Sequence, residues 1–203
     1  MWGDLLHEIY VLNWLDISAL ATGILYVLLA SREIIWCWPV GIINVILFFV
    51  IDIQALLYGE VGLQLVYFVL SFYGWYHWLH GGKTEATLKV SKAGEYSYLI
   101  AFLFVVAATF GLGQMLDIYT NTDVPYWDAW TNAMSLVAIW YQTRKKIENW
   151  LVWIAVDIVY VGLFYYKGFY FSSVLFAFYL IISFYGYRQW KRSMVIKPTL
   201  SIS

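Results

Sequence analysis

Seven long apolar runs, separated by short polar segments, follow one another along the chain. They cover residues 14–31, 34–54, 61–79, 97–116, 126–143, 149–166 and 170–187. Each has about the 20 residues that a helix needs to cross the hydrocarbon core of a bilayer. Apolar and polar residues do not alternate with a period of two, so helices are favoured over the strands of a barrel. The pattern therefore predicts seven transmembrane helices.

The first 13 residues follow a different pattern. Apolar side chains recur there at helical spacing, at positions 2, 5, 6, 9 and 12, but the segment is too short to span. We expect residues 1–13 to form a short helix that lies in the membrane interface. The segment lacks a basic start and a small-residue cleavage site, so we expect it to be retained.

The tetrapeptide SFYG occurs at residues 71–74 and again at 183–186. Sliding residues 14–78 by 112 positions aligns them with 126–190 without a gap, and 16 positions are then identical. Composition bias alone does not account for shared Asp, Arg and Trp positions and a four-residue run. We interpret residues 14–79 and 126–190 as two copies of a three-helix unit.

The apolar run 97–116 has no counterpart in this repeat, yet the geometry requires it. Three helices are an odd number, so two units joined directly would face opposite ways. One extra helix inside the 80–125 connection makes the copies parallel, related by an axis along the membrane normal. The predicted fold class is an all-α integral membrane protein with a 3+1+3 arrangement and a tail at 191–203.

Composition supports a membrane protein and excludes a soluble domain. Hydrophobic residues make up 63% of the chain and charged residues only 12%, against about 25% charged in soluble domains. The net charge of −1 gives no indication of a nucleic-acid partner.

The basic residues are distributed unevenly between the two sides of the membrane. Eleven of the twelve Lys and Arg residues follow the first, third, fifth and seventh runs, and only Lys167 lies on the other side. The positive-inside rule then predicts a cytoplasmic C-terminus and an N-terminus outside.

Polar residues within the runs are the candidates for function, because hydrocarbon penalises them. Asn44 lies near the middle of the second run and Asp157 near the middle of the sixth. Helical spacing aligns Asn149, Trp153 and Asp157 on one face. Gln64 is a further candidate from the third run. Asn132 and Gln142 in the fifth run are additional polar groups that we expect to face an interior.

The tryptophans fall into two groups. Those near run ends are expected to form an interfacial aromatic belt; they are Trp14, Trp36, Trp38, Trp127 and Trp150. Trp75 and Trp78, three residues apart within GWYHW at 74–78, are candidates for stacking against a solute. The single cysteine, Cys37, is expected to pack in the interior.

Several classes of function are disfavoured by the residues. His77 and His80 lack further ligands for a metal, and GGKT at 81–84 lacks the first glycine of a phosphate loop. The last run holds no lysine for a retinal cofactor. An enzyme should show more than Asp157 at mid-membrane depth, and a receptor would more often carry a larger soluble part than the short tail. We therefore expect a carrier without cofactor or metal, for a polar, aromatic small molecule, with a cationic one among the options.

Four stretches make the chain resemble the PnuC family of bacterial vitamin transporters. They are WPVGIINVILFF at 38–49, LYGEVGLQLVYFVLSFYGWYHW at 57–78, RKKIENWLVWIAVDIVYVGLFYYKG at 144–168 and the closing SFYGYRQW. The likeness extends over nearly all of residues 14–192. It includes a WxxW pattern at Trp75 and Trp78 and an ENWxxWxxxD pattern from Glu148 to Asp157.

The resemblance implies a fold similar to SWEET sugar transporters and facilitated diffusion of nicotinamide riboside across the bacterial inner membrane. It also implies a homo-oligomer, with a trimer as one form, and a separate cytoplasmic kinase that phosphorylates the vitamin and makes uptake one-way. Thiamine or riboflavin, or a sugar in a SWEET-like carrier, remain alternative substrates.

The resemblance also suggests roles for the candidate residues. Trp75, Trp78 and Trp153 would stack on the ring or gate the path. Asn44, Gln64 and Asn149 would bond the ribose and the carboxamide. Asp157 would face the cationic ring or hold Asn44 in place.

Overall fold

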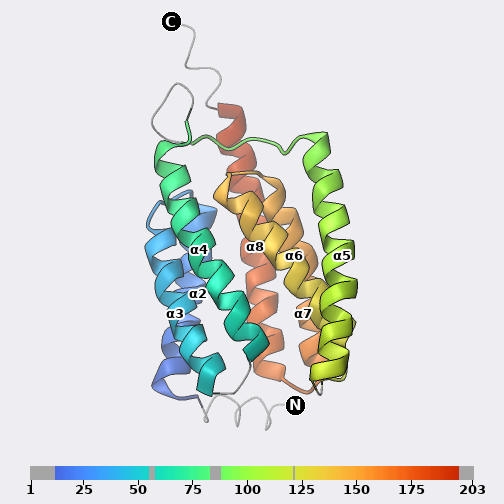
Figure 1. The fold of residues 1–203 in the computed structure, drawn as a ribbon. Coiled ribbons are helices and arrows are strands. Elements are labelled where there is room, and N and C mark those ends of the chain that lie inside the picture. Colours follow the sequence, from blue (N-terminus) through green and yellow to red (C-terminus); the bar gives the residue numbers. More distant parts are fainter. Residues whose placement is uncertain (1–11, 55–57, 83–87, 121, 197–203) are drawn as a thin grey trace, which may run out of the picture.

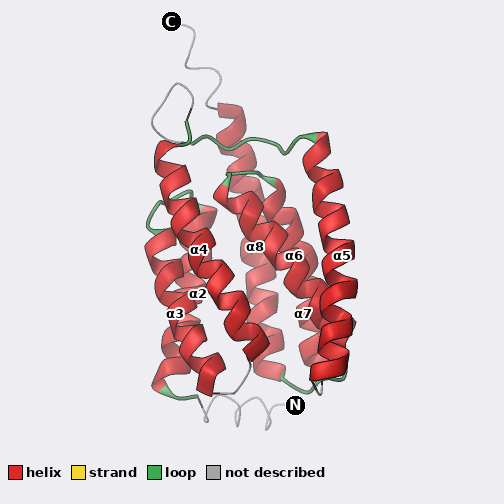
Figure 2. Cartoon of the chain, in the orientation of Figure 1, coloured by secondary structure: helices red, strands yellow, loops and turns green. Residues whose placement is uncertain are grey.

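The computed structural model describes residues 12–54, 58–82, 88–120 and 122–196, and these form helices joined by short connections (Figure 2). Within this part of the chain the helices are α2 (Trp14–Ser31), α3 (Cys37–Gln54), α4 (Tyr58–His80), α5 (Glu95–Tyr119), α6 (Pro125–Thr143), α7 (Glu148–Tyr166) and α8 (Tyr170–Ile196). Each of the seven predicted runs is a helix. The predicted interfacial helix at 1–13 lies almost wholly outside the described residues.

Local chemistry explains where the helices begin and end. Asn13 caps α2: its side-chain oxygen accepts from the backbone N–H groups of Leu15 and Asp16, at 2.8 and 3.1 Å, and Asp16 accepts from the N–H of Asn13 in return. Pro125 begins α6, where a missing N–H costs nothing. The second predicted run started too early at residue 34, because residues 32–36 form a turn before α3. α8 runs on to Ile196, past the predicted end of the second repeat at 190.

The helices run side by side in one bundle (Figure 1). In chain order α2 packs on α3 and α3 on α4, while α6 packs on α7 and α7 on α8. Two further contacts, α4 with α6 and α8 with α2, join these two rows of three into a closed ring. α5 stands at the side of the ring, against α6 (Figure 1).

Five of the described helices are long and apolar enough to cross a membrane by themselves: α2, α3, α5, α7 and α8. α4 and α6 are more polar. α6 is also the helix with the most buried residues, including Thr131, Ser135 and Gln142. The two helices are neighbours in the ring, and the buried polar residues of α6 lie between helices.

Two turns at one end of the bundle have the same hydrogen-bonding pattern. In the α2–α3 turn the N–H groups of residues 32, 33 and 34 donate to the carbonyls of 29, 30 and 29; in the α6–α7 turn those of 144, 145 and 146 donate to 141, 142 and 141. These positions differ by 112. We call this end, which also carries the 88–94 segment, the basic end, since Lys89, Lys92 and the run 144–146 lie there.

The 88–94 segment attaches α5 to the basic end of the second row. Ser91 exchanges backbone hydrogen bonds with the α6–α7 turn, donating to Lys145 and accepting from Ile147 at 3.1 and 3.0 Å. The carboxylate of Glu148 accepts from the N–H of Ala93 at 2.9 Å and from the hydroxyl of Tyr98 at 2.7 Å. The start of α7 thereby holds the start of α5.

Candidate functional site

Four buried tryptophans form a cluster near the basic end of the ring. Trp38, Trp78, Trp190 and Trp150 come from four different helices, and each is at most 2% exposed. Neighbouring rings meet edge to face, with centroids 5.4 Å apart for Trp38–Trp78, 5.8 Å for Trp78–Trp190 and 5.6 Å for Trp190–Trp150. Such packing favours the ring quadrupoles and fills a large volume. The cluster fills the space between four helices at this end.

The predicted interfacial belt is therefore wrong for two of its members. Trp14, Trp36 and Trp127 are exposed, as a belt requires, but Trp38 and Trp150 are 0% and 1% exposed and lie inside the cluster. The physical reason is the glycine opposite each ring. A Cβ added at Gly74 would overlap the ring of Trp38, and one added at Gly186 would lie 2.7 Å from the ring of Trp150.

Two indole hydrogen bonds cross between the two rows of helices. Nε1 of Trp78, from α4, donates to the carbonyl of Gln142 in α6 at 2.9 Å. Nε1 of Trp190, from α8, donates to the carbonyl of Ala30 in α2 at 3.0 Å. Positions 78 and 190, and positions 30 and 142, again differ by 112. Each row of helices thus supplies an indole N–H that donates to a carbonyl just before the interhelical turn of the other row.

Several buried polar atoms around the cluster make no hydrogen bond of standard geometry among the described residues. They are the Tyr26 hydroxyl, Nε1 of Trp38, Nε2 of Gln142, Oδ1 of Asn149 and Nε1 of Trp150. Leaving a buried donor or acceptor unpaired costs about 1–3 kcal/mol. Donors and acceptors gathered in one place suit a ligand or water molecules that carry both kinds of group.

The predicted site residues of α7 lie along one stretch of the interior. Asn149 is 0% exposed, and its Nδ2 donates to the carbonyl of Lys146 at 2.6 Å, while its Oδ1 is buried without a partner among the described residues. Trp153 is partly buried and packs against the tryptophan cluster. Asp157 is 3% exposed and accepts from the Ser183 hydroxyl of α8 at 3.0 Å.

Asn44 lies between α3 and α2. Its Nδ2 donates to the carbonyl of Ala19 at 2.7 Å and to the Thr22 hydroxyl at 3.0 Å. A Cβ added at Gly23 would lie 2.8 Å from the Tyr179 hydroxyl and 3.4 Å from Nδ2 of Asn44. Asn44 therefore sits close to the α2–α8 contact, and α2, not Asp157, holds its amide.

The remaining predicted residues lie at different depths. Trp75 is partly buried beside the tryptophan cluster, next to Trp78 along α4. Gln64 lies near the other end of α4, where its Nε2 donates to the carboxylate of Asp52 at 3.1 Å. The structure thus places Trp75 and Trp153 against the cluster that contains Trp78, and Asn149 directly precedes Trp150, another member of that cluster. Gln64, Asn44 and Asp157 are separate contacts, each between two neighbouring helices.

Sequence reasoning missed Tyr26, Tyr179 and Ser183, and placed Trp38 and Trp150 at the membrane surface. Tyr26 and Tyr179 were hidden among 18 tyrosines. The repeated sequence held a signal for these two tryptophans. Trp38 and Trp150 are identical under the 112-residue shift, and so are Gly74 and Gly186, the SFYG glycines that lie against their rings.

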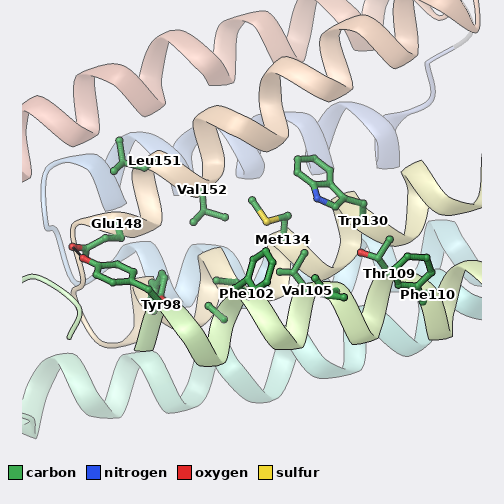
Figure 3. Close-up of a pocket in the computed structure, with 14 residues that line it drawn as sticks. Tyr98, Phe102, Val105, Thr109, Phe110, Trp130, Met134, Glu148, Leu151 and Val152 are labelled. Carbon is green, nitrogen blue, oxygen red and sulfur yellow. Dashed lines mark hydrogen bonds between the residues drawn. The ribbon is translucent and has the colours of Figure 1, made fainter. Parts of the chain in front are cut away.

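A separate cavity of about 600 Å³ lies between α5, α6 and α7 (Figure 3). Its walls are mainly apolar and include Phe102, Val105, Met134 and Val152, while Tyr98 and Glu148 lie at one end. None of the seven predicted site residues lines it. Its apolar lining offers little to a polar solute, so the candidate site is the interior beside the tryptophan cluster.

Comparison with known proteins agrees with this picture. The profile described as nicotinamide mononucleotide transporter matches residues 13–192. The chain is 29% identical to the nicotinamide riboside transporter PnuC of Escherichia coli strain K12, covering 91% of this chain and 87% of that protein. It is also 29% identical to the riboflavin/roseoflavin transporter RibM of Streptomyces davaonensis, covering 87% of this chain and 84% of RibM.

A solved structure is similar over almost the whole fold. The crystal structure of the vitamin B3 transporter PnuC superimposes with a TM-score of 0.69 at 26% identity, covering 93% of this chain and 86% of that one. A match of this extent to the family, over all seven described helices, is decisive. The chain is a multi-pass membrane protein that belongs to the nicotinamide mononucleotide transporter family.

Proposed function

We propose that this protein is a carrier for nicotinamide riboside. The observation that carries the proposal is the similarity, over about nine-tenths of the chain, to proteins named as nicotinamide riboside transporters. The candidate site has suitable chemistry: aromatic rings for a flat pyridinium, buried amides for a carboxamide and hydroxyls, and the Asp157 carboxylate for positive charge. Transport is facilitated diffusion, and a separate cytoplasmic kinase makes uptake one-way.

The carrier is built as a 3+1+3 parallel repeat. α2–α4 and α6–α8 are the copies, and α5 is the linker helix that lets them face the same way. Support comes from the ring of contacts, in which α4 with α6 and α8 with α2 are equivalent interfaces under the 112-residue shift. The matching turns and crossed indole bonds follow the same shift. Alternating access is then a rocking of the two rows about the central site.

The basic end faces the cytoplasm, with the N-terminus outside. The support is the charge distribution: the turns and segments that carry Lys and Arg gather at this end, and Lys167 lies at the other. In this orientation the tryptophan cluster closes the cytoplasmic side. Assembly of several copies, a trimer among the options, fits the many exposed apolar residues of α5, such as Phe102 and Phe110.

The seven candidate residues divide between substrate and closure. Trp75, Trp153 and Asn149 lie beside the tryptophan cluster and contact the pyridinium ring and the carboxamide of the riboside. Asn44, Gln64 and Asp157 line the path farther from the basic end. Trp78, whose indole is already bonded to Gln142, acts in closure more than in stacking.

Riboflavin is the second candidate substrate, because RibM matches at the same identity. Calorimetry on the purified protein separates the two: nicotinamide riboside, riboflavin and thiamine are titrated in parallel. We expect heat from the riboside alone. Binding of riboflavin or thiamine instead would keep the family and discard this substrate.

Variants test the site in the same assay. Asp157→Asn keeps the size of the side chain and removes its charge, and Trp153→Ala removes a ring; each is expected to weaken riboside binding roughly tenfold or more, about 1.4 kcal/mol. Trp127→Ala is the control, since Trp127 is 55% exposed away from the site. Equal affinity of all three variants and the parent would rule out this site.

A further inference from the structure

One ion pair joins the two turns at the basic end. Nζ of Lys145 lies 3.2 Å from Oε2 of Glu33, and the two side chains are only 8% and 13% exposed. Glu33 belongs to the α2–α3 turn and Lys145 to the α6–α7 turn. The pair thus connects the two rows of helices directly.

The pair occupies positions that differ by 112, the offset of the repeat. In a two-fold arrangement a residue can contact its own equivalent only close to the axis. Glu33–Lys145 is one such contact, and Trp78–Trp190, with centroids 5.8 Å apart, is another. Identical charges at an axis position would repel each other, whereas Glu in one copy and Lys in the other attract.

The backbone is unusual at the same two positions. Glu33 has φ 59° and Lys145 has φ 47°, and these are the described non-glycine residues with positive φ. Residues with a Cβ rarely adopt this conformation. It persists where the surroundings hold it, often at a functional device. A charged side chain stands here in both copies although the backbone favours glycine.

The pair also covers the tryptophan cluster. Nζ of Lys145 lies 4.5 Å from the centroid of the Trp78 ring, and the indole of Trp78 donates to Gln142, three residues before Lys145 in the α6–α7 turn. An ion pair, a cation–π contact and two crossed indole bonds therefore all join one row to the other at this end.

We propose that Glu33 and Lys145 are the latch of the gate on the basic side of the transport path, with Trp78 and Trp190 forming the layer beneath it. The latch holds the two rows together while the solute is bound from the other side, and it must open before the solute leaves at the basic end. This proposal deepens the proposed carrier function and rests on it.

The chain supplies a reporter for the test. Cys37 is the single cysteine, is fully buried and packs with Trp38 in the core cluster below the latch. An open gate exposes its thiol. The experiment measures the rate at which a membrane-impermeant maleimide labels Cys37 from each face of sealed, oriented vesicles that contain the full chain.

Glu33→Gln and Lys145→Gln each break the ion pair. In both variants, maleimide added on the side of the basic end should label Cys37 several-fold faster than in the parent protein. The exchanged double variant, Glu33→Lys with Lys145→Glu, restores attraction and should return to the parent rate. Trp78→Phe, which keeps a ring but removes the indole N–H, should also label faster. Cys37→Ala is the labelling blank, and Arg32→Gln is the matched control, a neighbouring exposed charge outside the pair.

The latch would be overturned if Cys37 in both single variants were labelled at the parent rate. It would also be overturned if Cys37 in the exchanged variant were labelled as fast as in the single variants. Unfolding midpoints recorded on the same samples exclude general loosening: a midpoint that falls for the single variants and stays low for the exchanged variant also counts against the latch. No substrate is needed, so a failed riboside titration and a failed latch are separate results. Fast labelling only at the outer face would reverse the orientation proposed above and keep the latch at the basic end.

Discussion

The tryptophans show how far a single residue can be interpreted from its sequence context. Position near the end of an apolar run favours a membrane-surface belt, and Trp14 and Trp36 are exposed, as this prediction requires. Trp38 and Trp150 have the same local pattern but are buried. The difference arises from Gly74 and Gly186, more than 30 residues away in the chain, whose missing side chains leave room for the rings. Hydropathy along the chain does not report a contact of this kind.

A substitution at Gly74 tests this packing. A methyl group there would overlap the ring of Trp38, and overpacking of a well-filled core costs about 1–3 kcal/mol. We expect Gly74→Ala to lower the midpoint of thermal unfolding in detergent. Gly62→Ala on the same helix is the control, because nothing lies within 4 Å of a Cβ added there; an equal drop for both would show that loss of helix glycine, not the tryptophan contact, is responsible.

At the scale of elements, apolar run length predicted all seven described helices, since a bilayer demands helices of one minimum length. Their ends were harder to predict. The run starting at residue 34 counted Ile34, Ile35 and Trp36 as helical because they are apolar, yet they form the turn set by the backbone of Glu33. Polarity within an apolar run marked Asn44, Gln64 and Asp157 but did not indicate which neighbouring helix each would contact.

The attachment of α5 is an element-scale feature with a testable role. Glu148 accepts hydrogen bonds from both the 88–94 segment and Tyr98. We expect Glu148→Ala to free this segment and to speed tryptic cleavage after Lys89 and Lys92 several-fold, as measured by mass spectrometry of timed digests. Tyr98→Phe should have a smaller effect because the bond to Ala93 remains.

Glu95→Ala is the control for this digest, since Glu95 is an exposed acidic residue at the same helix start. Cleavage of the Glu148→Ala variant at the parent rate would mean that the backbone bonds of Ser91 and the bonds from the Lys146 ammonium to Ser91 and Lys92 are sufficient to hold the segment.

At the scale of the whole molecule, the 112-residue shift predicted more than any single motif. The duplication itself stays a prediction, but residues related by this shift make matching turns and crossed indole bonds. The candidate site was less predictable, because it is not symmetric. Tyr26 and Asn149 have Ala138 and Cys37 at the positions related by 112, so the repeated pattern in the sequence does not mark these two polar residues.

A uniport mechanism makes a prediction for the whole molecule. In proteoliposomes, labelled nicotinamide riboside should enter until the inside and outside concentrations are equal, and a proton ionophore should not change that level. Preloading with unlabelled riboside should speed the entry of label, because the loaded carrier returns. Accumulation above the outside concentration would instead require coupling to an ion gradient.

The crossed indole bonds have a consequence for how the two copies can evolve. Trp78 completes the turn of the second copy and Trp190 that of the first, so neither copy is self-sufficient at this end. Under the proposed duplication, the ancestral unit could have closed its interior only as a pair of identical chains. Fusion would then have freed position 33 and position 145 to take opposite charges, a change that is impossible for two identical chains.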